Sequence, residues 1–282
     1  MANTFLQEEA VEYFNNATTL LNVFGRRIVG VDSDIVAEGD SLKWTELDRT
    51  KVGDGVITDG QVTTWGRPAL SDITLTINKE LGIAFRVLKK EAETTKRFNL
   101  HYAAEIQNKV ETLEGYVFAE IVAEADAFGG TDLAPTDGTT NEKLLKALAA
   151  LESKCVRENI PTDMRVLVAS PEFIGAVSIA RLLTRVDAYV EVSNYAGHFG
   201  TLALYSWTGI EATESGNEPI YFGYKNAIVT GVLIDSIYTD DNNVLFPDNL
   251  LCSGTFNAGV KAIKGDKVFV TYIDVNTVSI IS

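Results

Sequence analysis

One long run of helical periodicity constrains this chain more than any other feature. Between residues 98 and 128 an apolar side chain recurs at every third or fourth position, which is the spacing of one helix face. The members are Phe98, Tyr102, Ile106, Val110, Leu113, Val117, Ile121, Ala125 and Phe128. The pattern predicts a helix over residues 91–128 that ends at Gly129-Gly130 and is about 57 Å long. A helix of that length is too long for one small globular domain, so we expect neighbouring chains to cover part of its apolar face.

The segment before that helix alternates with a period of two. Apolar side chains fall on the odd positions from Ile73 to Val87, with Lys79 as the exception, which predicts one long β-strand. Residues 42–45 alternate similarly and are expected to pair with it. Residues 48–66, between the two, contain several glycines, so the pattern predicts a long two-stranded ribbon with a glycine-rich tip. Because an isolated hairpin is only marginally stable in water, we expect the ribbon to lie against a partner chain.

The second half of the predicted helix carries only negative charge. Every charged side chain from Val110 to Phe128 is an acid, and acids near a helix C-terminus oppose the helix dipole. Solvation of the carboxylates is one explanation. The other is that a neighbouring subunit supplies cations to Glu120 and Glu124, in which case changing both to Gln alters assembly and its salt dependence.

Helix and strand signals alternate after residue 138. Thr139 and Glu142 form a capping box that opens a helix running to Cys155. Residues 164–169 have the pattern of a buried strand, and Ser170 is placed to cap the helix that follows. This order indicates an α/β lobe, and short strands separated by glycines follow it.

The composition excludes several classes of function. The chain has 24 Lys and Arg against 39 Asp and Glu, a net charge of −15, and so lacks the basic surface of a general nucleic-acid binder. We expect the short basic cluster of Lys261, Lys264 and Lys267 to be a solvated face or a subunit contact. There is no membrane-spanning apolar run and no signal-peptide pattern. Cys155 and Cys252 lack pairing or ligand spacing, and no catalytic or metal-binding motif occurs, so we expect no enzyme, cofactor or metal.

The order of the predicted elements resembles that of the Hong Kong 97-type major capsid proteins of tailed bacteriophages. Those proteins have an N-terminal arm, a long hairpin, one long spine helix, an α/β lobe and a final strand. Residues 72–79 with 84–87 look like the family's hairpin strand entering the spine helix. Residues 165–173 look like its strand–Ser-Pro–helix step, and residues 197–201 resemble its glycine pair before the next strands.

The resemblance implies an α+β, HK97-like capsid fold made of five segments. They are an N-terminal arm over residues 1–40, an extended β-hairpin loop over 41–88, a spine helix with the peripheral domain over 89–135, an axial domain over 136–250, and a return to the peripheral domain over 251–282.

The resemblance also implies a structural function without cofactors. Copies of a major capsid subunit form hexamers and pentamers that close into an icosahedral shell around phage double-stranded DNA, without reading its sequence. The implied location is the virion, assembled in the host bacterial cytoplasm, with separate scaffolding, portal and decoration proteins as partners and no membrane. The residues expected to contact other subunits are Trp44, Lys51, Trp65, Arg67, Glu120 and Glu124.

Two other interpretations stay open at this stage. An encapsulin, a bacterial nanocompartment shell that encloses cargo enzymes, has the same fold and suits the same length and acidity. A β-rich phage appendage or glycan-binding protein accounts for the glycine-punctuated second half but leaves the long helix unexplained.

Removal of the ribbon tip tests its role in assembly. We expect a chain lacking residues 48–66 to keep a folded lobe but form no closed particles, because the ribbon is the part that reaches a neighbour. Circular dichroism monitors the fold and negative-stain microscopy monitors particles. Normal shells from this deletion would refute the role given to the ribbon.

Overall fold

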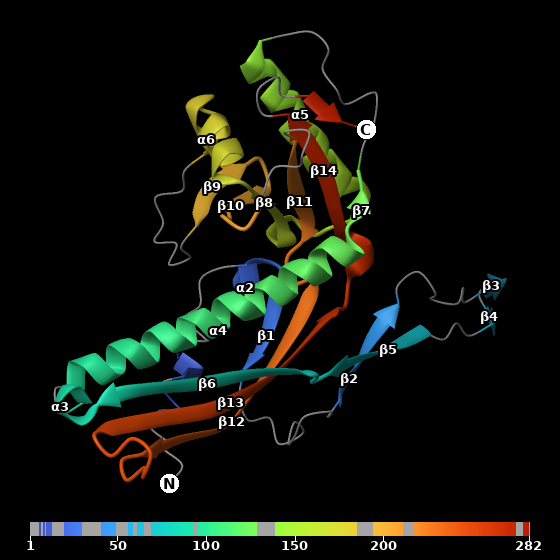
Figure 1. Ribbon diagram of the computed structural model, residues 1–282. Helices are drawn as coiled ribbons and strands as arrows, with labels where there is room; N and C mark the ends of the chain where they lie inside the picture. Colours follow the sequence, from blue (N-terminus) through green and yellow to red (C-terminus); the bar gives the residue numbers. More distant parts are fainter. Residues whose placement is uncertain are drawn as a thin grey trace.

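The chain forms an elongated body with a second, more compact part above one end (Figure 1). The computed structural model describes residues 6, 8, 10–12, 20–29, 41–48, 56–58, 61–64, 69–92, 95–128, 139–184, 194–210, 217–274 and 279–281. A four-stranded sheet underlies the elongated body, and a seven-stranded sheet forms the centre of the upper part.

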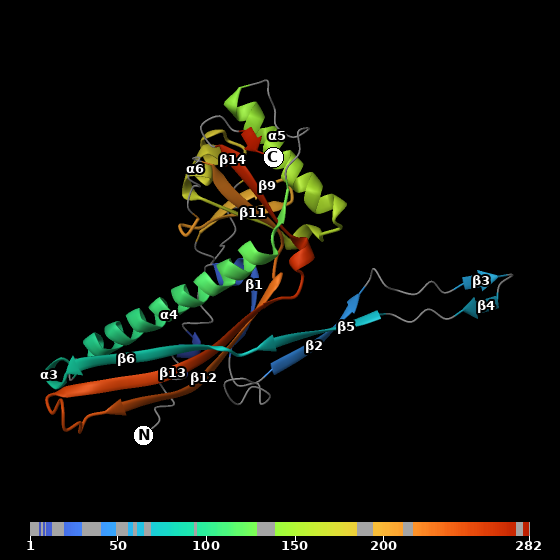
Figure 2. The same cartoon turned by 45° about the vertical axis from the view of Figure 1, so that its right-hand side comes forward.

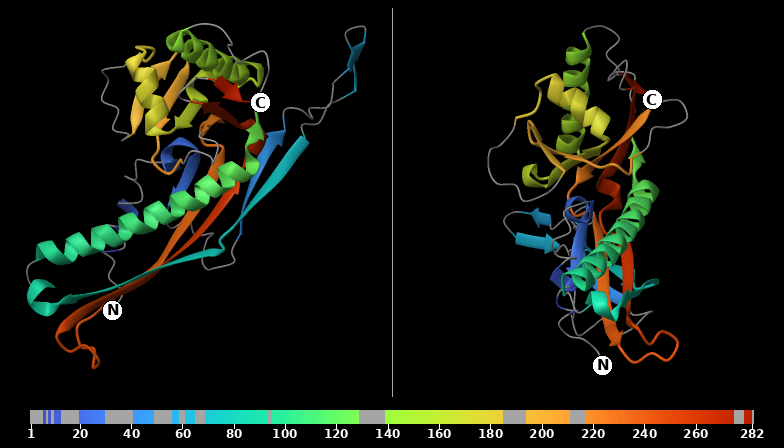
Figure 3. Two further views of the ribbon diagram at one scale, coloured as in Figure 1. Left: turned by 45° about the horizontal axis from the view of Figure 1, so that its top comes forward. Right: turned by 60° about the vertical axis from the view of Figure 1, so that its left-hand side comes forward.

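The four-stranded sheet has the order β1–β12–β13–β6. Strand β1 is parallel to β12, and the other neighbours are antiparallel. The strands are β1 (Gly25–Val29), β12 (Ile228–Asp240), β13 (Asn249–Ala262) and β6 (Lys79–Leu88). The long helix α4 (Thr95–Glu124) runs along this sheet, with the short helices α2 (Leu20–Val23) and α3 (Lys89–Ala92) nearby (Figures 1 and 3).

The predicted long helix is confirmed as α4, but it begins at Thr95, after the separate short helix α3, and it ends earlier than its periodicity suggests. Its apolar stripe is buried against the sheet through Tyr102, Ile106, Val110, Leu113, Val117 and Ile121. The helix stops at Glu124, because Asp126–Ala127 forms strand β7, which pairs in parallel with β14. Helical spacing continues by chance through a segment whose main chain is used in a sheet.

The predicted strand over residues 73–87 is two strands with different partners. Strand β5 (Ala69–Thr76) pairs with β2 (Ser41–Asp48), whereas β6 pairs with β13. The break lies at Ile77–Asn78, where the Asn78 amide donates to the Ala258 carbonyl at 3.1 Å. Period-two alternation is the same on both sides of such a break, so it cannot reveal the change of partner.

The predicted hairpin is confirmed. Strands β2 and β5 pair antiparallel, with Trp44 opposite Ile73, and β3 (Val56–Thr58) pairs with β4 (Gln61–Thr64) farther out. Figure 2 shows these strands extending away from the rest of the chain.

The seven-stranded sheet has the order β15–β14–β11–β8–β10–β9, with β7 beside β14. Its strands are β7 (Asp126–Ala127), β8 (Arg165–Ala169), β9 (Tyr195–Phe199), β10 (Leu202–Ser206), β11 (Glu218–Tyr224), β14 (Val268–Asp274) and β15 (Ser279–Ile281). Two helices cover one of its faces, α5 (Thr140–Arg157) and α6 (Pro171–Ile179) (Figure 3). Two short 3-10 turns, η2 (Thr162–Met164) and η3 (Gly265–Lys267), precede β8 and β14.

Both helix caps in this part follow the sequence signals. Thr139 accepts a hydrogen bond from the Glu142 amide, and the Glu142 carboxylate accepts one from the Thr139 amide at 2.8 Å. Ser170 accepts from the Phe173 amide at 3.1 Å, with Pro171 in the first turn of α6.

The seven-stranded sheet buries its two faces against different partners. Along β8, Leu167 and Ala169 join the core formed with α5 and α6, whereas Val166 and Val168 join the core that contains the α4 stripe. One apolar core therefore continues from the elongated body into the upper part. The boundary expected at residue 250 falls at the start of β13, yet β12 and β13 lie in the same sheet, and the chain returns to the seven-stranded sheet only at β14.

The hairpin leaves the body through a close approach of two main chains. A side chain on Gly259 of β13 would overlap the carbonyl oxygen of Thr76, at the end of β5. Leu75 and Ile77 flank this crossing and are fully buried against Val229 of β12. The base of the hairpin is thus packed against the sheet.

Substituting Gly259 tests this crossing. We expect Gly259→Ala to lower the free energy of unfolding by about 1–3 kcal/mol, because a β-carbon there must push two strands apart. Gly82→Ala is the matched control in the same sheet, since a β-carbon on Gly82 meets nothing within 4 Å. Urea denaturation of both variants checks the prediction, and equal stabilities would contradict it.

Candidate assembly surfaces

An exposed apolar loop lies at the far end of the elongated body, between β12 and β13 (Figure 1). We name residues 241–248 the tip loop. Val244 and Leu245 at its centre are 92% and 81% exposed, which makes them prominent apolar side chains on the surface. Leu88, which pairs with Asn249 at the base of the loop, is 50% exposed.

Polar contacts give the tip loop a defined shape. The Asp240 carboxylate accepts from the Asn242 amide at 3.0 Å, and the Asn243 side chain accepts from the Leu245 amide at 2.9 Å. Such turns fix the main chain without burying apolar side chains. Val244 and Leu245 are therefore held in water by a preformed turn, and these two adjacent apolar side chains form a candidate contact surface.

The tip loop is also anchored to the strand and helix beside it. The Arg86 guanidinium of β6 lies 5.0 Å from the centre of the Phe246 ring, a cation–π contact. The Lys89 amide of α3 donates to the Asp248 carbonyl at 2.9 Å. These contacts attach the loop to the end of the body, where α3 lies.

The hairpin is the second candidate surface, and its base is fixed to α4. The Lys79 ammonium, at the start of β6, lies 4.9 Å from the centre of the Tyr116 ring. Together with the buried Leu75 and Ile77, this contact packs the base of the hairpin against the body.

The structure describes only part of the predicted contact set. The main chain of Trp44 lies in β2, while its side chain falls outside what is described. Lys51, Trp65 and Arg67 also lie outside the described residues.

Glu120 has partners within its own chain. Its carboxylate accepts from the Ala262 amide at 3.0 Å and lies 3.8 Å from the Lys261 ammonium. Lys261 is 47% exposed, so this ion pair contributes at most about 1 kcal/mol. Glu124 is exposed and packs over Gly265, where a β-carbon would overlap its carboxylate. Lys261 of β13 thus supplies a cation to Glu120 from within the same chain. Contacts of Glu120 and Glu124 with a neighbouring subunit stay predictions.

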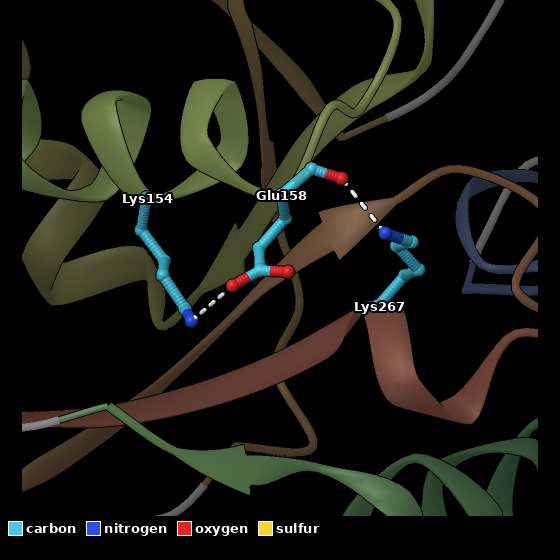
Figure 4. Close-up of polar contacts among 3 residues, drawn as sticks. All are labelled: Lys154, Glu158 and Lys267. Atoms are coloured by element: carbon cyan, nitrogen blue, oxygen red, sulfur yellow. Dashed lines mark hydrogen bonds and ion pairs between the residues drawn. The ribbon is translucent and has the colours of Figure 1, made fainter. Parts of the chain in front are cut away.

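A polar network ties α5 to the segment before β14 (Figure 4). The Lys154 ammonium donates to the Glu158 carboxylate at 2.6 Å, and the Lys267 ammonium donates to the Glu158 main-chain carbonyl at 2.7 Å. Lys154 also lies 4.6 Å from the centre of the Phe269 ring. The hydrogen bond from Lys154 is the main cause that lowers the pKa of Glu158 below its ordinary value of 4.5.

Sequence reasoning missed a second network in the upper part. The Glu152 carboxylate of α5 accepts from the Thr201 amide at 2.8 Å and from its hydroxyl at 2.6 Å. Arg165 donates to the same hydroxyl at 2.7 Å. Gly200, with a φ of 55°, allows the turn to come this close to Glu152. The paired glycines around this turn were the only signal in the sequence.

The described residues offer no metal centre or membrane helix. Within that part of the chain, no three His, Cys, Asp or Glu side chains gather closely enough to hold a metal ion. None of the described helices combines the length and the apolarity that crossing a membrane requires.

Comparison with known proteins identifies the fold. Neither a family model nor a curated protein matches the sequence. A structure from Mycobacterium phage Che8 matches with 16% sequence identity and a TM-score of 0.55, over 83% of this chain and 84% of that chain. The head structure of Helicobacter pylori bacteriophage KHP40 matches with 10% identity and a TM-score of 0.58, over 94% and 89%. A virus-like particle from Pyrococcus furiosus matches with 14% identity and a TM-score of 0.51, over 95% and 97%.

These likenesses extend over most of each chain and show the fold that the order of elements suggested. The chain has the mixed α+β fold of Hong Kong 97-type capsid proteins.

The Lys154–Glu158 pair predicts a pH-dependent contribution to stability. Because the folded-state pKa of Glu158 is lowered, its contribution is present above pH 4.5 and disappears as the pH falls through the folded-state pKa. We expect Glu158→Gln to be less stable than the wild-type chain at pH 7 and to differ from it by a smaller amount at pH 3, as measured by urea denaturation. Combining it with Lys154→Met should cost less than the sum of the two single changes. The same loss at both pH values would contradict this account.

Proposed function

We propose that this chain is the major capsid subunit of a tailed bacteriophage, a structural protein rather than an enzyme. The observation that carries the proposal is the near full-length likeness to phage capsid and head structures. In this proposal, copies form hexamers and pentamers that close into an icosahedral shell around double-stranded DNA.

The two sheets correspond to the two domains of such a subunit. The four-stranded sheet with α4 is the peripheral domain, and the seven-stranded sheet with α5 and α6 is the axial domain around the centre of each capsomer. Residues 1–40 are the arm, which adds β1 to the edge of the peripheral sheet, and β2 to β5 form the extended loop that overlaps a neighbour. Strand β12 then belongs to the peripheral domain and β14 to the axial domain, as their sheet partners favour.

The physical chemistry of both candidate surfaces supports self-assembly. Within the described residues, the two-stranded hairpin that leaves the body has no third strand or helix beside it, and such ribbons need one for independent stability. The tip loop exposes two apolar side chains to water, and burying them against another copy would lower the free energy. We assign Trp44, Lys51, Trp65 and Arg67 to contacts of the extended loop with a neighbour.

The net charge of −15 suits a container for DNA. Packaged DNA must move against the wall without being gripped by it, and an acidic chain does not displace counterions from phosphates. The shell would assemble in the host cytoplasm, with separate scaffolding, portal and decoration proteins, and remain in the virion.

An encapsulin-type nanocompartment is the second candidate. The match to the virus-like particle from Pyrococcus furiosus, which covers 97% of that chain, favours it. The contents of purified particles discriminate the two proposals, because a phage shell encloses DNA and a nanocompartment encloses a protein. A β-rich appendage accounts for neither α4 nor the capsid fold.

Changing the tip loop tests the proposal. We expect Val244→Ser/Leu245→Ser to keep the unfolding midpoint of the wild-type subunit, since both side chains already face water, and to lose closed shells in negative-stain images. Ile179→Ser is the control, because Ile179 is 84% exposed at the end of α6, in the other domain. Shells from the double variant with wild-type yield would contradict the role of the tip loop.

A further inference from the structure

Three segments carry the described chain between the two sheets, and they lie against one another. They are residues 124–126 from α4 to β7, residues 224–228 from β11 to β12, and residues 262–268 from β13 to β14. The Ile263 and Lys264 amides both donate to the Ala227 carbonyl, at 2.9 and 3.1 Å, which joins the second segment to the third. The Glu120 carboxylate, one turn before the end of α4, accepts from the Ala262 amide at 3.0 Å.

Three lysines extend from residues 261–267, at the end of β13 and just after it, to three different elements. We name residues 261–267 the junction segment. The Lys261 ammonium lies 3.8 Å from Glu120 on α4, and the Lys264 ammonium lies 4.2 Å from the centre of the Tyr224 ring at the end of β11. The Lys267 ammonium donates to the Glu158 carbonyl, just after α5, at 2.7 Å (Figure 4). The sequence suggested that these lysines form a solvated face or a subunit contact. In the structure, all three contact groups of their own chain.

A close main-chain approach fixes the same place. Gly223 of β11 has a φ of 142°, and a β-carbon there would overlap the carbonyl oxygen of Lys267. The end of the junction segment is thereby held directly against β11.

Apolar packing across the same region also holds the sheets together. Phe118 of α4 packs 4.6 Å from Trp207 and 5.3 Å from Tyr221, measured between ring centres. Burial of apolar surface is non-directional, whereas each lysine contact joins the junction segment to one defined group, the Tyr224 ring or the Glu158 carbonyl. The lysine contacts are therefore the better candidates for setting the relative orientation.

We infer that the junction segment is an orientation lock, in which Lys264 and Lys267 set the angle between the two sheets and so the curvature of the shell. The part about curvature rests on the proposed capsid function, whereas the angle is a property of the single chain. In this account Lys264 and Lys267 are positioning residues. Their removal changes how subunits tilt against one another without unfolding either sheet.

The test measures the angle and the shell separately. Lys264→Met/Lys267→Met keeps the aliphatic part of both side chains and removes both ammonium groups. The control is Lys143→Met/Lys146→Met on α5, which has the same spacing and the same change in net charge. Nitroxide labels on the exposed positions Gln107→Cys and Ala149→Cys report the distance between α4 and α5 by pulsed electron spin resonance. Cys155 and Cys252 are buried with the pKa of both thiols raised to about 11 by burial, so they resist labelling.

We expect a narrow distance distribution in the otherwise wild-type and control chains and a shifted or broadened one in the junction variant. Electron microscopy of the unlabelled chains should show wild-type shells from the control, and shells of altered diameter or open sheets from the junction variant. An unchanged distance distribution in the junction variant would overturn the lock, as would an altered one accompanied by shells of wild-type diameter. If the wild-type chain forms no shells, alone or with a scaffolding protein, while the junction variant still broadens the distribution, the lock stands as an orientation device and the capsid proposal fails.

Discussion

The burial of one face of α4 is the interaction on which the rest of this structure depends. Tyr102, Ile106, Leu113, Val117 and Ile121 are fully buried along it, and the same core takes in residues from both sheets. A helix of 30 residues is about 45 Å long, so a sheet that covers its apolar face must be long as well. The long strands β12, β13 and β6 meet that requirement, and the elongated shape follows from it. The seven-stranded sheet then joins at one end of the helix, where its second face completes the same core.

Local patterns predicted the elements well, because helix spacing, strand alternation and capping residues depend on neighbours in sequence. The cap at Thr139 and the alternation that predicted strands in β2 and β5 are examples. Contacts between residues distant in sequence could not be predicted from these local patterns. The alternation through Asn78 gives no sign that the pairing partner changes there from β2 to β13. The Glu120 carboxylate accepts from an amide 142 residues away, which no local pattern reveals. The tip loop was missed because exposure of Val244 and Leu245 is decided by how β12 and β13 end, and not by their own sequence.

The two candidate surfaces differ in what they leave unsatisfied. The hairpin extends main-chain edges beyond the body, so a partner strand or surface would complete its structure. The tip loop is complete in itself and lacks only cover for its apolar side chains. A subunit that needs a partner at the hairpin and a different contact at the tip loop suits a lattice better than a closed dimer. The junction segment lies between these places and the axial part, where a small change of angle alters how such a lattice curves.

A reconstruction by electron cryomicroscopy of particles formed by the purified wild-type chain tests the central claim most directly. The account predicts closed shells in which the hairpin and Val244–Leu245 of each copy are covered by neighbouring copies. A chain that stays a well-behaved monomer at high concentration, or a shell in which both surfaces face solvent, would contradict it.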